Sequence, residues 1–119
     1  MGYTKVVGVT YDNDDGTNRQ LIISELKYNS IINLKRDYSN LYDPNAIMVV
    51  NLSGEQIGFL SRDLASQLAP LIDQGSQIHV EISQLTGGGD YSRGVNILIY
   101  DKWIWSVTRT NIHLKYIRR

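Results

Sequence analysis

The sequence predicts a mainly β fold, either a small barrel or a strongly bent sheet of six or seven short strands with one or two short helices. Three observations predict this class. The 119 residues are enough for one hydrophobic core but not for two. Short β-branched and apolar segments recur at close spacing between Gly, Asn, Asp and Ser residues. Two stretches instead place apolar residues at helical spacing.

In the first part of the chain, residues 5–11 are β-branched and apolar and predict a strand. Residues 12–17 have the composition of a turn. Asn18 can then cap a short helix over residues 19–26, although partial alternation there leaves a strand as the alternative. Residues 31–36 predict the next strand, with Ile32 and Leu34 on one face.

A hairpin and a helix are expected in the middle of the chain. Residues 46–51 and 56–60 flank a Ser-Gly turn, and Gly58 inside the second strand indicates a close backbone approach or a bulge. The helix should begin at a Ser61 cap and end at Gly75. Pro70 should kink this helix or divide it into two.

The remaining segments predict further strands. Residues 77–85 alternate, and residues 94–100 form another apolar run. Between them, residues 86–93 are expected to form a mobile hairpin connection. Their three glycines do not predict a phosphate cradle, because no Lys-Ser/Thr pair and no helix follow. Alternation from Trp103 to Tyr116 predicts a terminal hairpin.

Composition excludes several classes of protein. The chain has no cysteine, which rules out disulfides and thiolate metal sites, and His79 and His113 are too far apart for a metal pair. No apolar run approaches the roughly 18 residues that span a bilayer, and the start lacks a secretory core. We therefore expect a cytoplasmic protein with no membrane contact, no metal and no cofactor.

Charge is distributed unevenly, although the net charge is zero. Residues 1–101 hold seven Lys/Arg and twelve Asp/Glu, a net of −5, whereas residues 102–119 hold five Lys/Arg and no acid. A neutral chain does not coat nucleic acid by charge alone. The basic tail either keeps an edge soluble or contacts a phosphate or a partner.

The segment from Leu34 to Asn45 has the composition of a binding loop. Pro44 pushes Asp43 toward an extended conformation, so the carboxylate is displayed. Tyr42 beside it and Tyr11 at the end of the first predicted strand offer two rings. Aromatic rings can hold unstacked bases, each worth roughly 1–3 kcal/mol. An aspartate near stacked bases would repel phosphate but could accept a hydrogen bond from a free sugar hydroxyl.

Two more residues extend this hypothesis, and a structural alternative stands beside it. Asn40 can donate to and accept from a sugar or base edge, and Arg62 at a helix start could meet a phosphate. Alternatively, Asp43 only caps a turn, and Tyr42 and Tyr11 pack against the core.

Five segments carry a resemblance to a known family over roughly residues 5–100. They are V-V-G-V-T-Y at 6–11, N-R-Q at 18–20, L-K-R-D-Y-S-N-L-Y-D-P-N-A-I-M-V at 34–49, G-E-Q-I-G-F-L at 54–60 and L-A-S-Q-L-A-P-L at 64–71. Together they resemble the HIRAN domain, which occurs as a small free-standing protein and as a module of fork-remodelling helicase-like translocases. The resemblance implies a modified OB-like β-barrel. We expect one domain over residues 1–119, in which residues 101–119, outside the resemblance, form an extra C-terminal hairpin or extension.

The resemblance further implies capture of single-stranded DNA at a free 3′-hydroxyl end, in DNA repair or replication. Tyr11 and Tyr42 would stack on bases, Asp43 would accept from the terminal hydroxyl, and Asn40 would support it. Arg62 would contact the backbone. Two positions depart from the DNA-capturing pattern, because Thr10 replaces an arginine and Phe59, near the pocket, replaces a histidine.

An alternative function follows from these departures. The same scaffold could serve as a protein-interaction or assembly module, with a homo-oligomer or protein partner bound through the Trp103/Trp105 segment. An enzyme is not expected, because the sequence shows no nucleophile–base pair, metal cluster or nucleotide loop.

Overall fold

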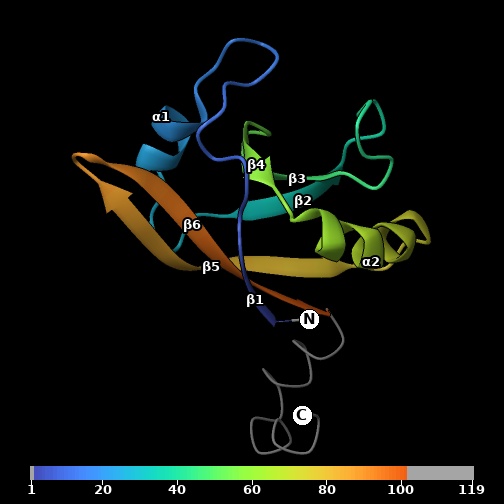
Figure 1. The fold of residues 1–119 in the computed structure, drawn as a ribbon. Coiled ribbons are helices and arrows are strands. Elements are labelled where there is room, and N and C mark those ends of the chain that lie inside the picture. The colour runs from blue at the N-terminus through green and yellow to red at the C-terminus, as the bar shows by residue number, and fades with distance from the viewer. Residues whose placement is uncertain (1, 102–119) are drawn as a thin grey trace, which may run out of the picture.

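The computed structural model describes residues 2–101, so the predicted terminal hairpin lies outside the described part of the chain. Six strands and two helices follow one another in the order β1, α1, β2, β3, β4, α2, β5, β6 (Figure 1). Their bounds are Gly2–Lys5 for β1, Arg19–Ser24 for α1, Ile32–Arg36 for β2, Ile47–Asn51 for β3, Gln56–Phe59 for β4, Arg62–Asp73 for α2, Ile78–Gly88 for β5 and Tyr91–Asp101 for β6. Neither helix is long and apolar enough to cross a membrane.

The strands form two antiparallel sheets of three strands each, in the orders β1-β6-β5 and β2-β3-β4. One isolated bridge links them, since Val7 donates its N–H to the Phe59 carbonyl (2.8 Å) and accepts from the Phe59 N–H (2.9 Å). The predicted mainly β class with two short helices is therefore confirmed. Within residues 2–101 the sheets do not close into a barrel, so the barrel itself is not confirmed.

The core is built from β-branched residues of both sheets. The largest fully buried side chains are Val6, Ile47, Val49, Ile57, Val95, Ile97 and Ile99. They pack together with Ile22 and Ile23 of α1 and with Ala65, Leu68 and Ala69 of α2. Burying a side chain of this size contributes about 1.5–3 kcal/mol, so this shared core holds the two sheets and both helices together.

The first predicted strand is displaced in the structure. It was expected over residues 5–11, but β1 covers only Gly2–Lys5, where it pairs with β6. The reason is a change of partner. Whereas β1 pairs with β6, Val7 pairs with Phe59 of β4. Gly8 then adopts a positive φ of 72°, which ends the extended segment. Residues 8–18, called loop 8–18 below, connect this point to α1.

Both helices begin at the predicted caps. The Asn18 Oδ1 accepts from the Leu21 N–H (2.9 Å) at the start of α1, which decides for the helix over the strand alternative. The Ser61 Oγ accepts from the Leu64 N–H (3.3 Å) at the start of α2.

The helix α2 is one continuous helix, so of the two outcomes predicted for Pro70, a kink or a division, the division is wrong. Pro70 removes the N–H that would donate to the Ser66 carbonyl, but both residues lie on the exposed face of α2, where water can hydrogen-bond to that carbonyl. The helix then closes with a Schellman motif at Gly75, whose φ is 92°. There the Ser76 N–H donates to Leu71 (2.9 Å) and the Gly75 N–H donates to Ile72 (3.0 Å).

Glycines govern the geometry of both hairpins. A Cβ on Gly58 would lie 2.5 Å from the Val7 carbonyl oxygen, which confirms the predicted close approach. The β5–β6 connection is shorter than predicted, because pairing continues to Gly88 opposite Tyr91. A Cβ on Gly87, whose φ is 74°, would overlap the Ser92 carbonyl, so this glycine permits a tight turn where a longer loop was expected.

Candidate nucleic-acid interface

Residues 37–46, called loop 37–46 below, join β2 to β3 and contain three of the predicted site residues. The loop closes at its base, where the Asp37 N–H donates to the Ala46 carbonyl (2.9 Å). Inside it, the Asn40 Oδ1 accepts from the backbone N–H groups of Tyr42 and Asp43, both at 2.9 Å. Asn40 therefore shapes the loop, and a contact from this side chain to nucleic acid stays a prediction.

Tyr42 presents its ring to solvent, with 87% of the residue exposed. Its backbone is nevertheless fixed, since the Arg62 Nη2 donates to the Tyr42 carbonyl (2.9 Å). The core-edge alternative for Tyr42 is thus wrong. An exposed ring on a fixed backbone segment provides a flat surface on which a base can stack.

The Asp43 carboxylate has two different oxygens. Oδ1 accepts from the Asn45 N–H (2.9 Å), which is the turn-capping role that the structural alternative expected. Oδ2 faces Arg62, whose Nε lies 3.8 Å away. The side chain is 16% exposed. Asp43 is therefore a fixed acceptor with one oxygen committed to the loop and the other directed at a solvent-exposed cation.

Tyr11 and Phe59 form a second group around Gly8. Tyr11 is 69% exposed and Phe59 is half-buried. A Cβ on Gly8 would lie 3.8 Å from Cδ2 of each ring and 3.2 Å from the Nη1 of Arg19. The Arg19 guanidinium carbon lies 5.3 Å from the Phe59 ring centroid. Tyr11 and Phe59 thus share a neighbourhood with a cation, as the sequence did not indicate.

Arg19 anchors loop 8–18 although it is only 7% exposed. Its Nε donates to the Asn13 Oδ1 (2.6 Å) and its Nη1 donates to the Gly8 carbonyl (2.7 Å). Burial lowers the pKa of Arg19, and the charges of Asp14 and Asp12 oppose that effect. Sequence reasoning treated Arg19 only as the first residue of a helix. The available signal was a cation directly after an N-cap, with three acids among residues 12–15.

A network of Arg36, Tyr38 and Asp73 anchors loop 37–46. The Asp73 Oδ1 accepts from the Arg36 Nε (3.0 Å) and the Tyr38 hydroxyl (2.7 Å). These two hydrogen bonds, first Arg36 and then Tyr38, lower the pKa of Asp73. The same partner raises the pKa of Arg36 and that of Tyr38. Sequence reasoning missed this network, because Asp73 lies 37 residues from Arg36.

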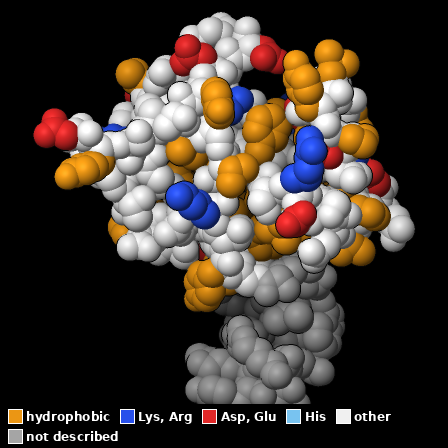
Figure 2. Space-filling view, viewed as in Figure 1, with side chains coloured by type: hydrophobic (Ala, Val, Ile, Leu, Met, Phe, Trp, Pro, Cys, Tyr) orange, Lys and Arg blue, Asp and Glu red, His pale blue; other side chains and the backbone are white. Residues whose placement is uncertain are grey.

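The β4–α2 connection joins the Tyr11–Phe59 group to the Asp43–Arg62 pair, since Phe59 ends β4 and Arg62 begins α2. Both loops project on the same side of the molecule (Figure 1). Figure 2 shows hydrophobic side chains at the upper right, where loop 37–46 lies, and on the face between the loops, with acidic side chains at the tip of loop 8–18. Within residues 2–101 the Tyr11 and Tyr42 rings make no stacking contact with each other. Any convergence of the two rings on one ligand is therefore a prediction.

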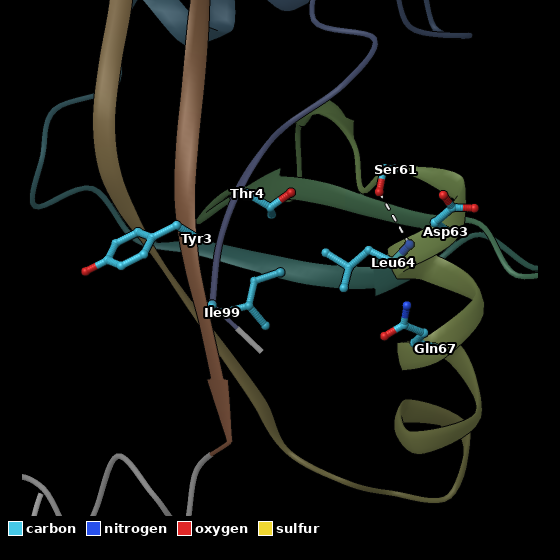
Figure 3. Close-up of a pocket in the computed structure, with 8 residues that line it drawn as sticks. Tyr3, Thr4, Ser61, Asp63, Leu64, Gln67 and Ile99 are labelled. Carbon is cyan, nitrogen blue, oxygen red and sulfur yellow. Dashed lines mark hydrogen bonds between the residues drawn. The ribbon is translucent and has the colours of Figure 1, made fainter. Parts of the chain in front are cut away.

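A separate hollow of about 380 Å³ lies between β1, β6 and the start of α2 (Figure 3). Its lining residues are Gly2, Tyr3, Thr4, Ser61, Asp63, Leu64, Gln67 and Ile99. In Figure 3, Leu64 and Ile99 face one another across it, whereas Tyr3 projects away. None of these lining residues is basic, and one is an acid, so this hollow is a poor site for a phosphate.

Solved structures share this fold. The crystal structure of the HIRAN domain of human HLTF matches with a TM-score of 0.60 and 28% identity, covering 82% of this chain and 70% of that one. An NMR structure of the HLTF HIRAN domain in its DNA-bound conformation matches with a TM-score of 0.56 and 26% identity, covering 98% of this chain and 88% of that one.

The family model for the HIRAN domain matches residues 1–100, and the chain therefore belongs to the HIRAN domain family. Human helicase-like transcription factor is 47% identical over 45 residues, which cover 38% of this chain and 4% of that protein. The chain spans only 4–6% of the length of the curated relatives that it matches.

Proposed function

We propose that this chain is a non-enzymatic module that binds single-stranded DNA, preferentially at a free 3′-hydroxyl end. The binding surface is the face flanked by loop 8–18 and loop 37–46. The observation that carries the proposal is the Asp43 carboxylate, which is fixed by the Asn45 N–H, faces Arg62 and belongs to the residue that follows the exposed Tyr42. The DNA-bound conformation of the related HLTF domain supports DNA as the ligand.

Stacking and one hydrogen bond account for end selection. The terminal base stacks on Tyr42, and the 3′-hydroxyl donates to the Asp43 Oδ2. A 3′-phosphate has no such donor and brings a negative charge against the carboxylate. Two unit charges 4 Å apart repel by about 1 kcal/mol in water and about 4 kcal/mol at an effective dielectric constant of 20. A half-buried carboxylate lies between these limits, so we expect discrimination of roughly tenfold or more.

Charge contributes little to the affinity. Residues 1–101 carry a net charge of −5, Thr10 supplies no cation, and Arg62 is the exposed cation of the site. Each phosphate that a protein neutralises on a single strand contributes about −0.7 to the slope of log K against log salt. We therefore expect a slope between about −0.7 and −1.4, for one or two phosphates, and affinity that depends mainly on stacking.

The proposed biological setting is DNA repair or replication, where free 3′-hydroxyl ends are exposed. The helicase-like relatives support this setting, and the chain itself supplies the module that would recognise such an end.

Fluorescence anisotropy with labelled single-stranded oligonucleotides tests the proposal. The same sequence is compared with a 3′-hydroxyl, with a 3′-phosphate, and with a 5′-phosphate as the control for charge alone. We expect weaker binding of the 3′-phosphate by roughly tenfold and little effect of the 5′-phosphate. Equal binding of all three would exclude end selection, and no binding would exclude DNA as the ligand.

A second candidate function is a protein-interaction module, which Leu41 favours. This side chain is 92% exposed, and Tyr38 and Tyr42 of the same loop are exposed as well. Exposed apolar groups gathered on one loop are typical of a contact surface. Light scattering tests this candidate. A self-associated species that Leu41→Ser dissociates would support it, whereas a monomer at all concentrations would count against self-association.

A further inference from the structure

Arg36 lies at the base of loop 37–46, where β2 ends. It pairs in register with Ile47, the first residue of β3, so its side chain stands where the loop leaves the sheet and returns to it. Its side chain is 7% exposed. A guanidinium that is this well covered must place its donors on protein acceptors.

Two of these acceptors belong to the returning limb of the loop. The Arg36 Nη1 donates to the Ala46 carbonyl (2.8 Å), and the Nη2 donates to the Pro44 carbonyl (3.0 Å). Pro44 directly follows Asp43. The hydrogen bond to Pro44 therefore fixes the backbone one residue beyond the proposed end-binding carboxylate.

Asp73 and Tyr38 fix the orientation of the guanidinium itself. Asp73, the last residue of α2, accepts from the Arg36 Nε (3.0 Å) and Nη2 (3.4 Å). The Tyr38 ring lies against the guanidinium, with its centroid 4.5 Å from the Arg36 carbon. The hydroxyl of the same tyrosine donates to Asp73. The planar guanidinium thus has its donor edge and one of its faces occupied.

We infer that Arg36 is the positioning residue for the Asp43 carboxylate and hence a determinant of 3′-end selection, with Asp73 and Tyr38 as its supports. The 3′ end as ligand rests on the proposed function, whereas the positioning of Asp43 by Arg36 rests on the geometry of the loop. Asn40 and Arg62 hold the backbone at Tyr42 and Asp43, whereas Arg36 ties the returning limb to the end of α2. End selection then depends on side chains that do not touch DNA.

Lysine cannot replace arginine in this role. An ammonium group is a single point of charge, and it cannot donate in one plane to two carbonyls and a carboxylate. Arg36→Lys keeps the positive charge and removes the planar set of N–H donors. Asp73→Asn keeps an acceptor for Tyr38 and removes the charge. Lys35→Arg, at the adjacent exposed position of β2, is the matched control.

The test measures two quantities on these three variants and on the unmodified chain. The first is the amide hydrogen exchange rate of Asn45, whose N–H donates to Asp43. The second is the ratio of the dissociation constants for oligonucleotides that end in a 3′-phosphate and in a 3′-hydroxyl. For Arg36→Lys we expect roughly tenfold faster Asn45 exchange and a roughly fivefold lower ratio, in line with the loss of one charge-assisted hydrogen bond. Asp73→Asn should show smaller changes in the same direction, and Lys35→Arg none.

A merely structural role would weaken both oligonucleotides equally and leave their ratio unchanged, and this result would overturn the inference. So would an unchanged Asn45 exchange rate in the folded Arg36→Lys variant. If Arg36→Lys does not fold, Asp73→Asn decides by the same two readouts. If the unmodified chain shows no end preference, the proposed function fails, and Asn45 exchange alone decides whether Arg36 positions Asp43.

Discussion

Loop 8–18 and loop 37–46 are each anchored by an arginine that lies against an aromatic ring, but the two anchors differ in their partners. Arg19 lies 5.3 Å from the Phe59 ring and donates to neutral oxygens. Arg36 lies 4.5 Å from the Tyr38 ring and donates to a carboxylate as well as to carbonyls. Accordingly, burial lowers the pKa of Arg19, whereas hydrogen bonding to Asp73 raises the pKa of Arg36.

Because of this difference, we expect Arg19 to be needed for folding and Arg36 to control the geometry of loop 37–46. Arg19 is buried, and the second donor to the Gly8 carbonyl, the Tyr11 N–H, lies 3.4 Å away, so loss of Arg19 should damage the fold. Arg36 is held through Asp73, which is exposed and ionised, so its hold on the loop should respond to chemistry at the surface. The predictions below test this contrast.

The largest effect is expected from Arg19→Met. This change removes the Arg19 donor from the Asn13 Oδ1 and leaves the Gly8 carbonyl with the longer hydrogen bond from the Tyr11 N–H (3.4 Å). We expect the free energy of unfolding to fall by about 2–4 kcal/mol, since each hydrogen bond to a charged group contributes about 1.5–3 kcal/mol. Urea denaturation measures it. A loss below about 1 kcal/mol would show that Arg19 is not the anchor of loop 8–18.

Gly58→Ala should act on the Val6–Val7 segment that leads into loop 8–18. The added Cβ would lie 2.5 Å from the Val7 carbonyl oxygen and 2.6 Å from the Val6 Cγ1, so β4 and the Val6–Val7 segment must separate. Overpacking of this kind costs about 1–3 kcal/mol. Denaturation of this variant is compared with Ser53→Ala in the adjacent exposed turn. Equal stability of the two variants would contradict the close approach.

Some elements of the fold could be predicted from local sequence patterns and others could not. Local signals were sufficient for β2, β3 and β4 within a residue at each end, and for the Asn18 and Ser61 caps. The first strand was misplaced because Val7 pairs with Phe59, more than fifty residues away, and a local sequence pattern does not indicate such a pairing.

The candidate site shows the same limit. Asn40, Tyr42 and Asp43 lie within four residues of one another, and the contacts that join them are local. Arg19 and Arg36 act on atoms that only the folded chain brings near, such as the Phe59 ring and the Asp73 carboxylate. The exposure of Tyr42 was therefore predictable from the sequence. The low exposure of the Asp43 side chain (16%), which was expected to be displayed, and the groups that hold the loops in place were not.

The exposed rings allow a comparison of the two loops in binding. Tyr42→Ala and Tyr11→Ala should each weaken DNA binding by about 1–3 kcal/mol if both rings stack on bases, with little change in stability. Tyr3→Ala, at an exposed ring on β1, is the control and should bind normally. Anisotropy titrations measure all three. Normal binding by Tyr11→Ala alone would restrict the interface to loop 37–46.

The smallest effect is expected from pH. The pKa of Asp73 is lowered below its usual 3.8, so its contribution to stability is present above that value and is lost as pH falls through the lower folded pKa. The pKa of Tyr38 is raised above its usual 10.0, so its contribution is present below that value and is lost as pH rises through the higher folded pKa.

We therefore expect the Arg36–Asp73–Tyr38 contacts to be unchanged between about pH 5 and pH 9 and to weaken at either extreme. Side-chain NMR shifts of Asp73 and Tyr38 measure this, with Asp73→Asn as the control that removes the acid transition. An Asp73 midpoint above 3.8 would contradict the pairing.

The Asp43 carboxylate is tested most directly by comparing 3′-hydroxyl and 3′-phosphate oligonucleotides on the unmodified chain and on Asp43→Asn. The asparagine oxygen can still accept from the Asn45 N–H, so the loop should keep its shape. We expect that the preference for the 3′-hydroxyl, roughly tenfold in the unmodified chain, disappears in Asp43→Asn because binding of the 3′-phosphate improves. An undiminished preference in Asp43→Asn would contradict it.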